Sequence, residues 1–175
     1  MSSTRPITRD DVPELTEVLR HNRGFMAPWE PVRTDAYFTE KEQDALIVEV
    51  LARRERGHAL PYVIVDDAGR IVGRITLSGI VRGPFLSCSV GYWVAAADNG
   101  HGLATAALGE IKSVAFEQLG LHRIQGETLL HNVASQRVLD RNGFVRIGLA
   151  PKYLNIAGSW QDHILYQALS TEENT

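Results

Sequence analysis

The segment VGYWVAAADNGHGLATAALGEIKSVAF, residues 90–116, carries the most informative pattern in the chain. Its first six residues, Val90–Ala95, are a mainly apolar run with two valines and two aromatic residues, which is typical of a buried strand. Asp98-Asn99-Gly100 is typical of a turn. From Leu103 onward, apolar residues recur with the spacing of one helix face: Leu103, Ala104, Ala107, Leu108, Ile111, Val114 and Ala115. The segment therefore predicts a strand, a glycine-containing turn and a helix, in that order.

This order of elements is one that builds anion-binding sites. The first N–H groups of a helix have no partner within it and lie at the positive end of the helix dipole. Gly100 and Gly102 have no Cβ, so a phosphate group can approach their backbone closely. The turn lacks the GK[ST] ending of a nucleotide P-loop, and the chain has no GxGxxG motif. Taken alone, the two glycines fit a phosphate site and a simple tight turn equally well.

Two motifs give this segment a family. Residues 99–104, NGHGLA, resemble the acetyl-CoA pyrophosphate loop of the GNAT N-acetyltransferases, Gln/Arg-x-x-Gly-x-Gly/Ala. Gly102 and Ala104 fit that pattern, whereas Asn99 replaces the usual long polar residue. Residues 132–144, NVASQRVLDRNGF, resemble the second signature of the family, N-x-x-S-x-x-[VL]-L-x-x-x-G-F. Two motifs in the family's order identify the chain as a member of the GNAT superfamily.

Two further segments resemble one branch of that superfamily. Residues 25–33, FMAPWEPVR, and residues 152–163, KYLNIAGSWQDH, are similar to Rim-type enzymes, which acetylate the N-terminal alanine of ribosomal proteins. The resemblance covers Ile7–Leu169 and implies the GNAT fold: an α+β (mixed α/β) domain with a strongly twisted mixed sheet, splayed central parallel strands and flanking helices. Composition and periodicity alone indicate only an α/β or α+β protein.

Composition sets bounds on organisation and partners. The 175 residues, 44% of them hydrophobic, suit one domain over 1–175 with a core of about 7–169. A net charge of −3 does not suggest a nucleic-acid-binding protein. The single cysteine, Cys88, excludes an internal disulfide framework, fits the cytoplasm and is read as a strand residue rather than a nucleophile. No leader, membrane segment or metal-ligand spacing is expected.

The remaining elements follow from local patterns. Asp10-Asp11 with Pro13 predicts a helix start, and the segment around Pro28 and Pro31 predicts an ordered loop over Phe25–Arg33. The first four residues are read as a loose tail. The other expected elements are helices at Thr39–Arg56 and Asn132–Arg141, and strands at Pro61–Val65, Ile71–Leu77, Phe85–Ala95, Arg123–Leu129, Phe144–Ile147 and His163–Ala168.

The resemblance also assigns roles in cofactor binding. It implies that the backbone of Trp93, Val94 and Ala95 pairs with the pantetheine arm of acetyl-CoA. The pyrophosphate would be held by the loop, whose residues are Asn99, Gly100, His101, Gly102, Leu103, Ala104 and Thr105. Asn132 and Ser135 would lie against the pantetheine and sulfur, with Ser135 as the proton donor to the leaving thiolate. Asn132 could instead be a helix N-cap, and His101 a solvated loop residue.

Acetyl transfer to an amine requires a neutral amine, a closely held thioester and protonation of the thiolate. An α-amine has a reference pKa of about 7.7–8.0, so the base has a mild task and a water held by polar groups can suffice. Glu127, on a strand entering the cleft, is the first choice, with Glu30 and Asp162 as alternatives. By the resemblance, Trp29, Glu30 and Asp162 lie near the acceptor.

The leading prediction is an acetyl-CoA-dependent transferase that acts directly, without an acyl-enzyme, on a protein N-terminus, with a ribosomal protein as the expected partner. A small-molecule amine, such as an antibiotic or a toxic aminoacyl nucleotide, is the alternative acceptor. A non-catalytic module that binds acyl-CoA is the alternative of another class. No nucleic acid, membrane or metal partner is expected, and both a monomer and a homodimer are compatible with the sequence.

Overall fold

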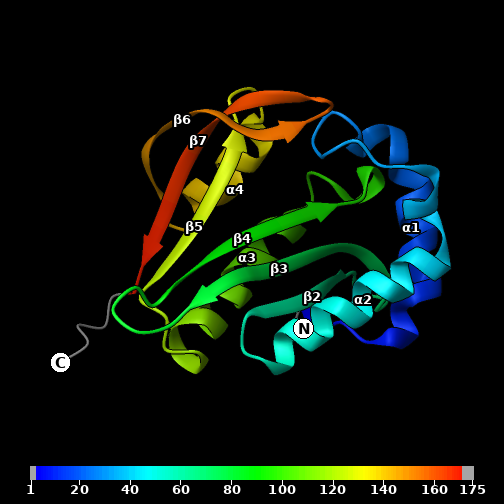
Figure 1. Cartoon of the computed structure of the whole chain (residues 1–175), viewed down its shortest axis with the longest axis horizontal. Helices are drawn as coiled ribbons and strands as arrows, with labels where there is room; N and C mark the ends of the chain where they lie inside the picture. The colour runs from blue at the N-terminus through cyan, green and yellow to red at the C-terminus, as the bar shows by residue number, and fades with distance from the viewer. Residues whose placement is uncertain (1–2, 171–175) are drawn as a thin grey trace.

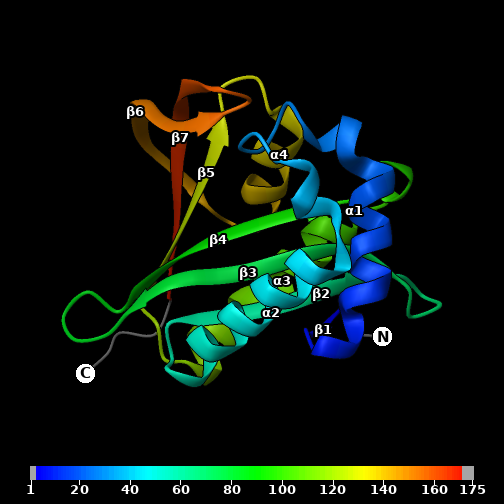
Figure 2. The same ribbon diagram turned by 45° about the vertical axis from the view of Figure 1, so that its right-hand side comes forward.

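A computed structural model describes residues 3–170 as a seven-stranded sheet with helices on both faces (Figures 1 and 2). The strand order is β1-β2-β3-β4-β5-β7-β6, and only β4 and β5 are parallel neighbours. The strands are β1 Thr4–Pro6, β2 Ala59–Val65, β3 Ile71–Val81, β4 Ser87–Val94, β5 Arg123–Leu129, β6 Val145–Ile156 and β7 Ser159–Leu169. The longer helices are α1 Val12–Met26, α2 Glu40–Glu55, α3 Leu103–Ser113 and α4 Val133–Arg141. The predicted mixed α/β class is confirmed.

The two central strands separate along their length. β4 and β5 pair only where Ser87–Ser89 faces Arg123–Gln125, although both strands continue for several residues beyond. From there they diverge, as Figure 1 shows. Backbone groups on the facing edges of the two strands are therefore left without a strand partner, which is unusual in the middle of a sheet. The splayed central strands implied by the family resemblance are confirmed.

The sheet has a separate apolar core on each face. On one face, α3 and α4 pack over β3, β4 and β5, and the predicted α3 stripe supplies Ala107, Leu108 and Ile111, all fully buried. On the other face, α1 and α2 cover β2 and the start of β3 through residues such as Leu15 and Ile47. Cys88 is buried in β4 at 3% exposure and belongs to the first core, as predicted.

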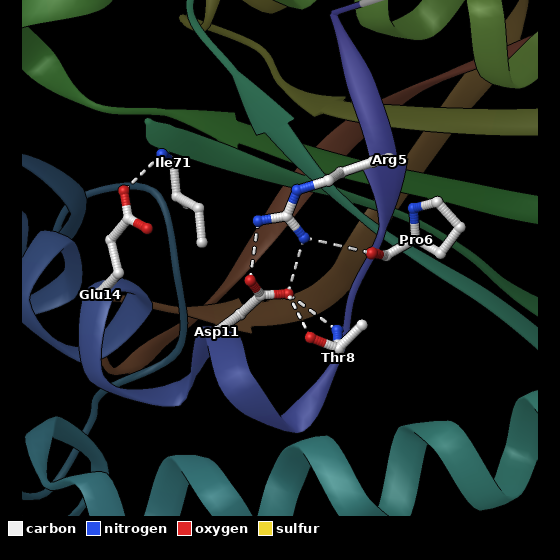
Figure 3. Close-up of polar contacts among 6 residues, drawn as sticks. All are labelled: Arg5, Pro6, Thr8, Asp11, Glu14 and Ile71. Atoms are coloured by element: carbon white, nitrogen blue, oxygen red, sulfur yellow. Dashed lines mark hydrogen bonds and ion pairs between the residues drawn. The ribbon is translucent and has the colours of Figure 1, made fainter. Parts of the chain in front are cut away.

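The start of α1 is fixed to the sheet by a polar cluster (Figure 3). The Arg5 guanidinium on β1 donates to both oxygens of Asp11, at 2.9 and 2.7 Å, and the amide of Thr8 also donates to Asp11, at 2.8 Å. Burial alone would raise the pKa of Asp11, but these hydrogen bonds outweigh it and hold the pKa below its ordinary value. Glu14 accepts the amide of Ile71 at 2.7 Å, which ties α1 to β3.

Two predicted boundaries near the N-terminus were wrong. The chain forms a short edge strand at Thr4–Pro6, paired with β2, whereas Thr4 was expected in a loose tail. Residues 1–2 of that tail lie outside the described part of the chain. Helix α1 runs through Phe25 to Met26, because the first residue that cannot continue it, Pro28, comes only afterwards. The loop therefore begins at Ala27.

The last two strands are longer than predicted. β6 and β7 form one long hairpin that includes most of the segment 152–163, which was expected to connect two short strands. The irregularity that hid this hairpin is a bulge between Ala150 and Leu154. Lys152 there has φ 47°, and its amide donates to the Asp162 carboxylate at 2.9 Å. A bulge breaks the alternation of residue types from which strands are predicted.

Candidate active site

A cavity of about 260 Å³ lies at the N-terminus of α3. Its lining brings together seven residues predicted to hold the cofactor: Val94, Asn99, Gly100, Gly102, Leu103, Ala104 and Thr105. Asp98 also lines it, and α4 forms the opposite wall with Ala134, Arg137, Val138 and Arg141. His101 is exposed in the same loop but does not line this cavity. The strand–turn–helix order predicted for residues 90–116 is thus what creates the cavity.

The floor of this cavity is backbone. Gly102 caps α3 with φ 82°, a conformation that glycine adopts without strain, and a Cβ at this position would point into open space. The first amide bonded within the helix is that of Ala106, which donates to Gly102 O at 2.9 Å. The preceding amides of Leu103, Ala104 and Thr105 therefore have no helical acceptor and lie at the positive end of the dipole. This is suitable geometry for a phosphate group.

Two asparagines fix the chain where it leaves β4. The Asn99 amide nitrogen donates to Val94 O and Ala95 O, both at 3.0 Å, so the loop folds back on the strand that precedes it. The buried Asn22 of α1 accepts the Ala96 amide at 2.8 Å. The bonds of Asn99 give a reason for its presence where the family motif has a longer polar residue, because its short side chain places the amide group at the end of β4. No sequence pattern indicated this role for Asn22.

Arg137 and Arg141 are pocket residues that the sequence analysis missed. They lie one helical turn apart on α4 and so share the face that lines the cavity. Both are exposed, and neither makes an ion pair within residues 3–170. Two arginines outweigh the single carboxylate of Asp98 and make the cavity favourable to an anion. The spacing R-x-x-x-R inside the second motif was the available signal.

Along β4, successive residues direct their backbone N–H and C=O groups alternately toward β3 and toward the gap that opens between β4 and β5. The Ala95 amide donates to Val72 O at 2.7 Å, and in an antiparallel pair every second residue makes such bonds. Trp93 and Ala95 therefore direct their amides toward β3, and Val94 and Tyr92 direct theirs toward the gap beside β5. Of the three residues predicted to pair with pantetheine, Val94 is the one whose amide faces the gap. Its carbonyl accepts a hydrogen bond from the Asn99 side chain.

Ser135 lies in the wall of the gap and is bonded to Tyr92. The two hydroxyl oxygens are 2.9 Å apart, and the Tyr92 hydroxyl also lies 3.3 Å from Ser135 O. Burial raises the pKa of Tyr92 to about 12, and the hydrogen bond with Ser135 acts in the opposite direction. Tyr92 is thus a neutral phenol at physiological pH. The side chain of Asn132 accepts the Ser135 amide at 3.1 Å, so the N-cap considered for it is present.

Glu127 reaches the gap from the other face of the sheet. Its neighbour Gly126 faces Leu139 of α4, so alternation along β5 turns Glu127 toward the face that carries α1 and α2. Burial raises the pKa of Glu127, and its Oε2 is buried without a hydrogen-bond partner in the described part of the chain. The Tyr153 phenol on β6 is close, since the charge of Glu127 contributes to the raised pKa of that phenol.

The predicted acceptor residues form the rim of this face. The Trp29 ring lies 5.3 Å from the ring of His131, and Glu30 O accepts the amide of Ala157 in the β6–β7 turn at 3.0 Å. The loop after α1 thus contacts both the connection from β5 to α4 and the turn between β6 and β7. Asp162 has a structural contact, the amide of Lys152 in the bulge.

Two other kinds of feature are absent from residues 3–170. In that part of the chain, no group of three His, Cys, Asp or Glu side chains is arranged to hold a metal ion. None of the helices that the structure describes is long and apolar enough to cross a bilayer.

Comparison with known proteins agrees with this geometry. The family model described as "Acetyltransferase (GNAT) domain" matches residues 4–145. The chain belongs to the GNAT acetyltransferase family. It is 33% identical over 166 residues to the ribosomal protein uS5-alanine N-acetyltransferase of Escherichia coli, covering 94% of this chain and 85% of the relative.

Two solved structures share the whole fold of this GNAT enzyme. The ribosomal-protein-S5-alanine acetyltransferase of Vibrio fischeri superposes with a TM-score of 0.92 at 32% identity, covering 97% of this chain and 93% of the other. RimJ of Mycobacterium smegmatis in complex with CoA-disulfide also gives 0.92, at 30% identity, covering 98% and 83%. The chain is an N-acetyltransferase with Rim-type relatives, as its motifs predicted, and GNAT acetyltransferases use acetyl-CoA.

Proposed function

We propose that this GNAT enzyme transfers the acetyl group of acetyl-CoA to the N-terminal α-amine of a protein, with ribosomal proteins as the acceptor class. The observation that carries the proposal is a gap that runs through the sheet between β4 and β5. An anion site and the Ser135 hydroxyl lie on one side of the gap, and the Glu127 carboxylate approaches from the other. The names of the uS5-alanine relatives support the acceptor class.

The chain's own groups fit acetyl-CoA. The amides of Leu103–Thr105 suit the pyrophosphate, and Arg137 and Arg141 add positive charge beside it. The gap-facing amide of Val94 suits a carbonyl oxygen of the pantetheine arm. Acetyl-CoA supplies an activated thioester, and positioning it against the amine accounts for most of the rate expected of such a site.

Glu127 serves as the base, directly or through a water. Its raised pKa makes it a better proton acceptor than an ordinary glutamate. The α-amine has a pKa of about 7.7–8.0 and needs only mild assistance. The amine nitrogen then bonds to the acetyl carbon, the bond from carbon to sulfur breaks, and one amine proton passes to Glu127.

The Ser135–Tyr92 pair completes the proton balance. Ser135 donates its hydroxyl proton to the departing thiolate and is resupplied by Tyr92 or water, since either hydroxyl of this pair can be the donor. Solvent then reprotonates Tyr92 and takes up the proton held by Glu127, which restores the starting state. Direct attack is favoured over an acyl-enzyme for two reasons. Burial raises the pKa of the only cysteine, Cys88, to about 12, and the Ser135 hydroxyl is bonded to a phenol rather than to a base.

A peptide library with free N-termini, read by mass spectrometry, tests the proposal. Peptides that begin with alanine should gain one acetyl group at the α-amine, whereas free lysine and aminoglycosides should give much lower kcat/KM. Trp29→Ala should lower kcat/KM for peptides and leave the Kd for acetyl-CoA unchanged, because Trp29 lies on the rim. Preferred acetylation of aminoglycosides or of lysine side chains would reject the N-terminal acceptor. Acetyl-CoA binding without turnover on any amine would indicate a binding module.

A further inference from the structure

A second cavity, of about 280 Å³, lies beside the proposed acceptor face and has no part in the chemistry described above. It is formed by α2, the loop before α2, and β3. Three arginines line it, Arg33, Arg53 and Arg74, together with Tyr37 and Glu49. We call these residues the arginine pocket.

Two of the three arginines already have a carboxylate partner. Arg33 Nε lies 3.3 Å from Glu30 Oε2, and its guanidinium carbon stands 4.3 Å above the ring of Tyr37. Arg53 Nη2 lies 2.8 Å from Glu49 Oε1. The arginine pocket therefore has three positive charges against two negative charges, which leaves one positive charge uncompensated.

That charge belongs to Arg74. Its guanidinium makes no hydrogen bond or ion pair within residues 3–170, although it is largely buried. Burial lowers its pKa, and the nearby Tyr37 hydroxyl offsets this only in part. Retaining an unpaired guanidinium in a buried position is unfavourable for the folded protein, so a ligand that supplies an anion there would gain from it.

The arginine pocket is continuous with the acceptor face. Arg74 is paired with Trp93 of β4, so both side chains point to the face that also carries Glu127. Gly91, two residues before Trp93 and therefore on the same face of β4, is exposed although it lies within a strand. Figure 1 shows no helix over β4 and β5 on this face. A peptide can therefore lie across the strands from Glu127 toward α2.

The spacing fixes which acceptor residue can reach Arg74. β3 and β5 are two strands apart, and paired strands spaced about 4.8 Å would put them about 10 Å apart. Because β4 and β5 have already diverged at Glu127, the separation from Glu127 to Arg74 is larger than this, on the order of 10–15 Å. An extended peptide advances about 3.3 Å per residue, so its third to fifth residue arrives at the arginine pocket. One uncompensated positive charge matches one aspartate or glutamate side chain.

We propose that the arginine pocket binds the carboxylate of an aspartate or glutamate at about the third to fifth position of the acceptor polypeptide, with Arg74 as its main partner. This inference rests on the proposed function, because it takes a peptide as the acceptor. A bidentate contact between a guanidinium and a carboxylate gives direction as well as affinity, so the pocket selects among N-termini that share the same first residue.

The test compares matched peptides that begin with alanine and carry either glutamate or glutamine at position 3, 4 or 5. The wild-type enzyme should favour the glutamate peptide at one of these positions by about tenfold in kcat/KM, or 1.4 kcal/mol, mainly through KM. Arg74→Gln should abolish the preference. Arg54→Gln, an exposed arginine of α2 outside the pocket, should retain it.

The outcomes separate the two proposals. Equal kcat/KM for glutamate and glutamine peptides in the wild-type enzyme overturns the arginine pocket and leaves N-terminal acetylation intact. A preference that survives Arg74→Gln overturns Arg74 as its source. Absence of α-amine acetylation in every peptide overturns the proposed function instead. The wild-type comparison requires no variant to fold, and thermal denaturation of Arg74→Gln, whose Tm should equal or exceed that of wild type, checks the variant itself.

Discussion

The cofactor side and the acceptor side of this enzyme are built in different ways. The cavity at the N-terminus of α3 is mainly backbone: a glycine with positive φ, three helical amides and a loop held by Asn99 and Asn22. The acceptor side is made of side chains from distant segments, among them Trp29, Glu127 and Arg74. A backbone site needs a short contiguous motif, whereas a side-chain site depends on where the fold brings separate elements together. The two sides should therefore respond differently to substitution.

The largest effect is expected at Ser135, where the two sides meet. Ser135→Ala should lower kcat by about 10- to 1,000-fold, because it removes the hydroxyl next to the leaving sulfur while sparing the cofactor cavity. Tyr92→Phe should cost less, since Ser135 can still donate its own proton. If the two hydroxyls act as one relay, the double variant should be no slower than Ser135→Ala alone. Near-wild-type kcat in Ser135→Ala would leave water as the sole donor.

The next largest effect should come from Gly102. Gly102→Val should weaken acetyl-CoA binding by about tenfold or more in calorimetry, since the branched side chain enters the space beside the free amides. Gly69→Val is a matched control, with φ 80° against 82° and the same open space around its Cβ, but it lies in the β2–β3 turn. Both variants should lose similar stability from backbone strain. Equal Kd values for the two would show that strain, not the cofactor site, accounts for the loss.

Substitution of Glu127 should lower the rate less than the preceding variants lower kcat or cofactor binding, and it should raise the stability. Glu127→Gln should lower kcat/KM by about fivefold to tenfold, because the α-amine needs only a weak base. In wild type, kcat/KM should fall with decreasing pH as the raised pKa of Glu127 is approached from above, and this limb should vanish in the variant. An unchanged pH profile in Glu127→Gln would remove Glu127 as the base.

The same raised pKa gives a second readout. As pH rises, the unfolded chain ionises this glutamate before the folded protein does, so its burial lowers the free energy of unfolding at neutral pH. Glu127→Gln should therefore raise the Tm near pH 7, by about 2–4 °C for each kcal/mol recovered. The gain should disappear once the pH falls below the ordinary pKa of glutamate. Glu117→Gln, which removes an exposed carboxylate, should show no such gain.

This contrast also explains what could be predicted from the sequence. The cofactor loop was located because Gly100, Gly102 and the α3 stripe are contiguous and their spacing follows from backbone geometry. The Tyr92–Ser135 contact joins residues 43 positions apart and depends on how α4 docks beside β4. In the sequence, Arg74 is an ordinary charged residue of a predicted strand. Only the folded structure shows that α2 packs beside it and that its guanidinium is buried without a carboxylate partner in the described part of the chain. The hairpin of β6 and β7 was missed in part because the Lys152 bulge interrupts its alternation.

The smallest effect should come from Arg137 and Arg141, the side-chain part of the cofactor cavity. Each exposed ion pair contributes about 0.2–1 kcal/mol, so Arg137→Gln or Arg141→Gln should raise the Kd for acetyl-CoA by up to about fivefold. The difference from wild type should shrink as salt is added, because the Debye length is already about 8 Å at physiological ionic strength. The Gly102 effect should persist at the same salt, since it comes from steric exclusion. Repeating the titration with acetyl-dephospho-CoA shows which phosphate group an arginine contacts. Substitution of an arginine that contacts the 3′-phosphate should no longer change the Kd for this ligand, whereas substitution of one that contacts the pyrophosphate should still raise it. Arg146→Gln, an exposed arginine of β6 outside the cavity, is the charge-matched control. If it weakens binding as much as the α4 variants do, the effect comes from the net charge of the protein and not from this wall of the cavity.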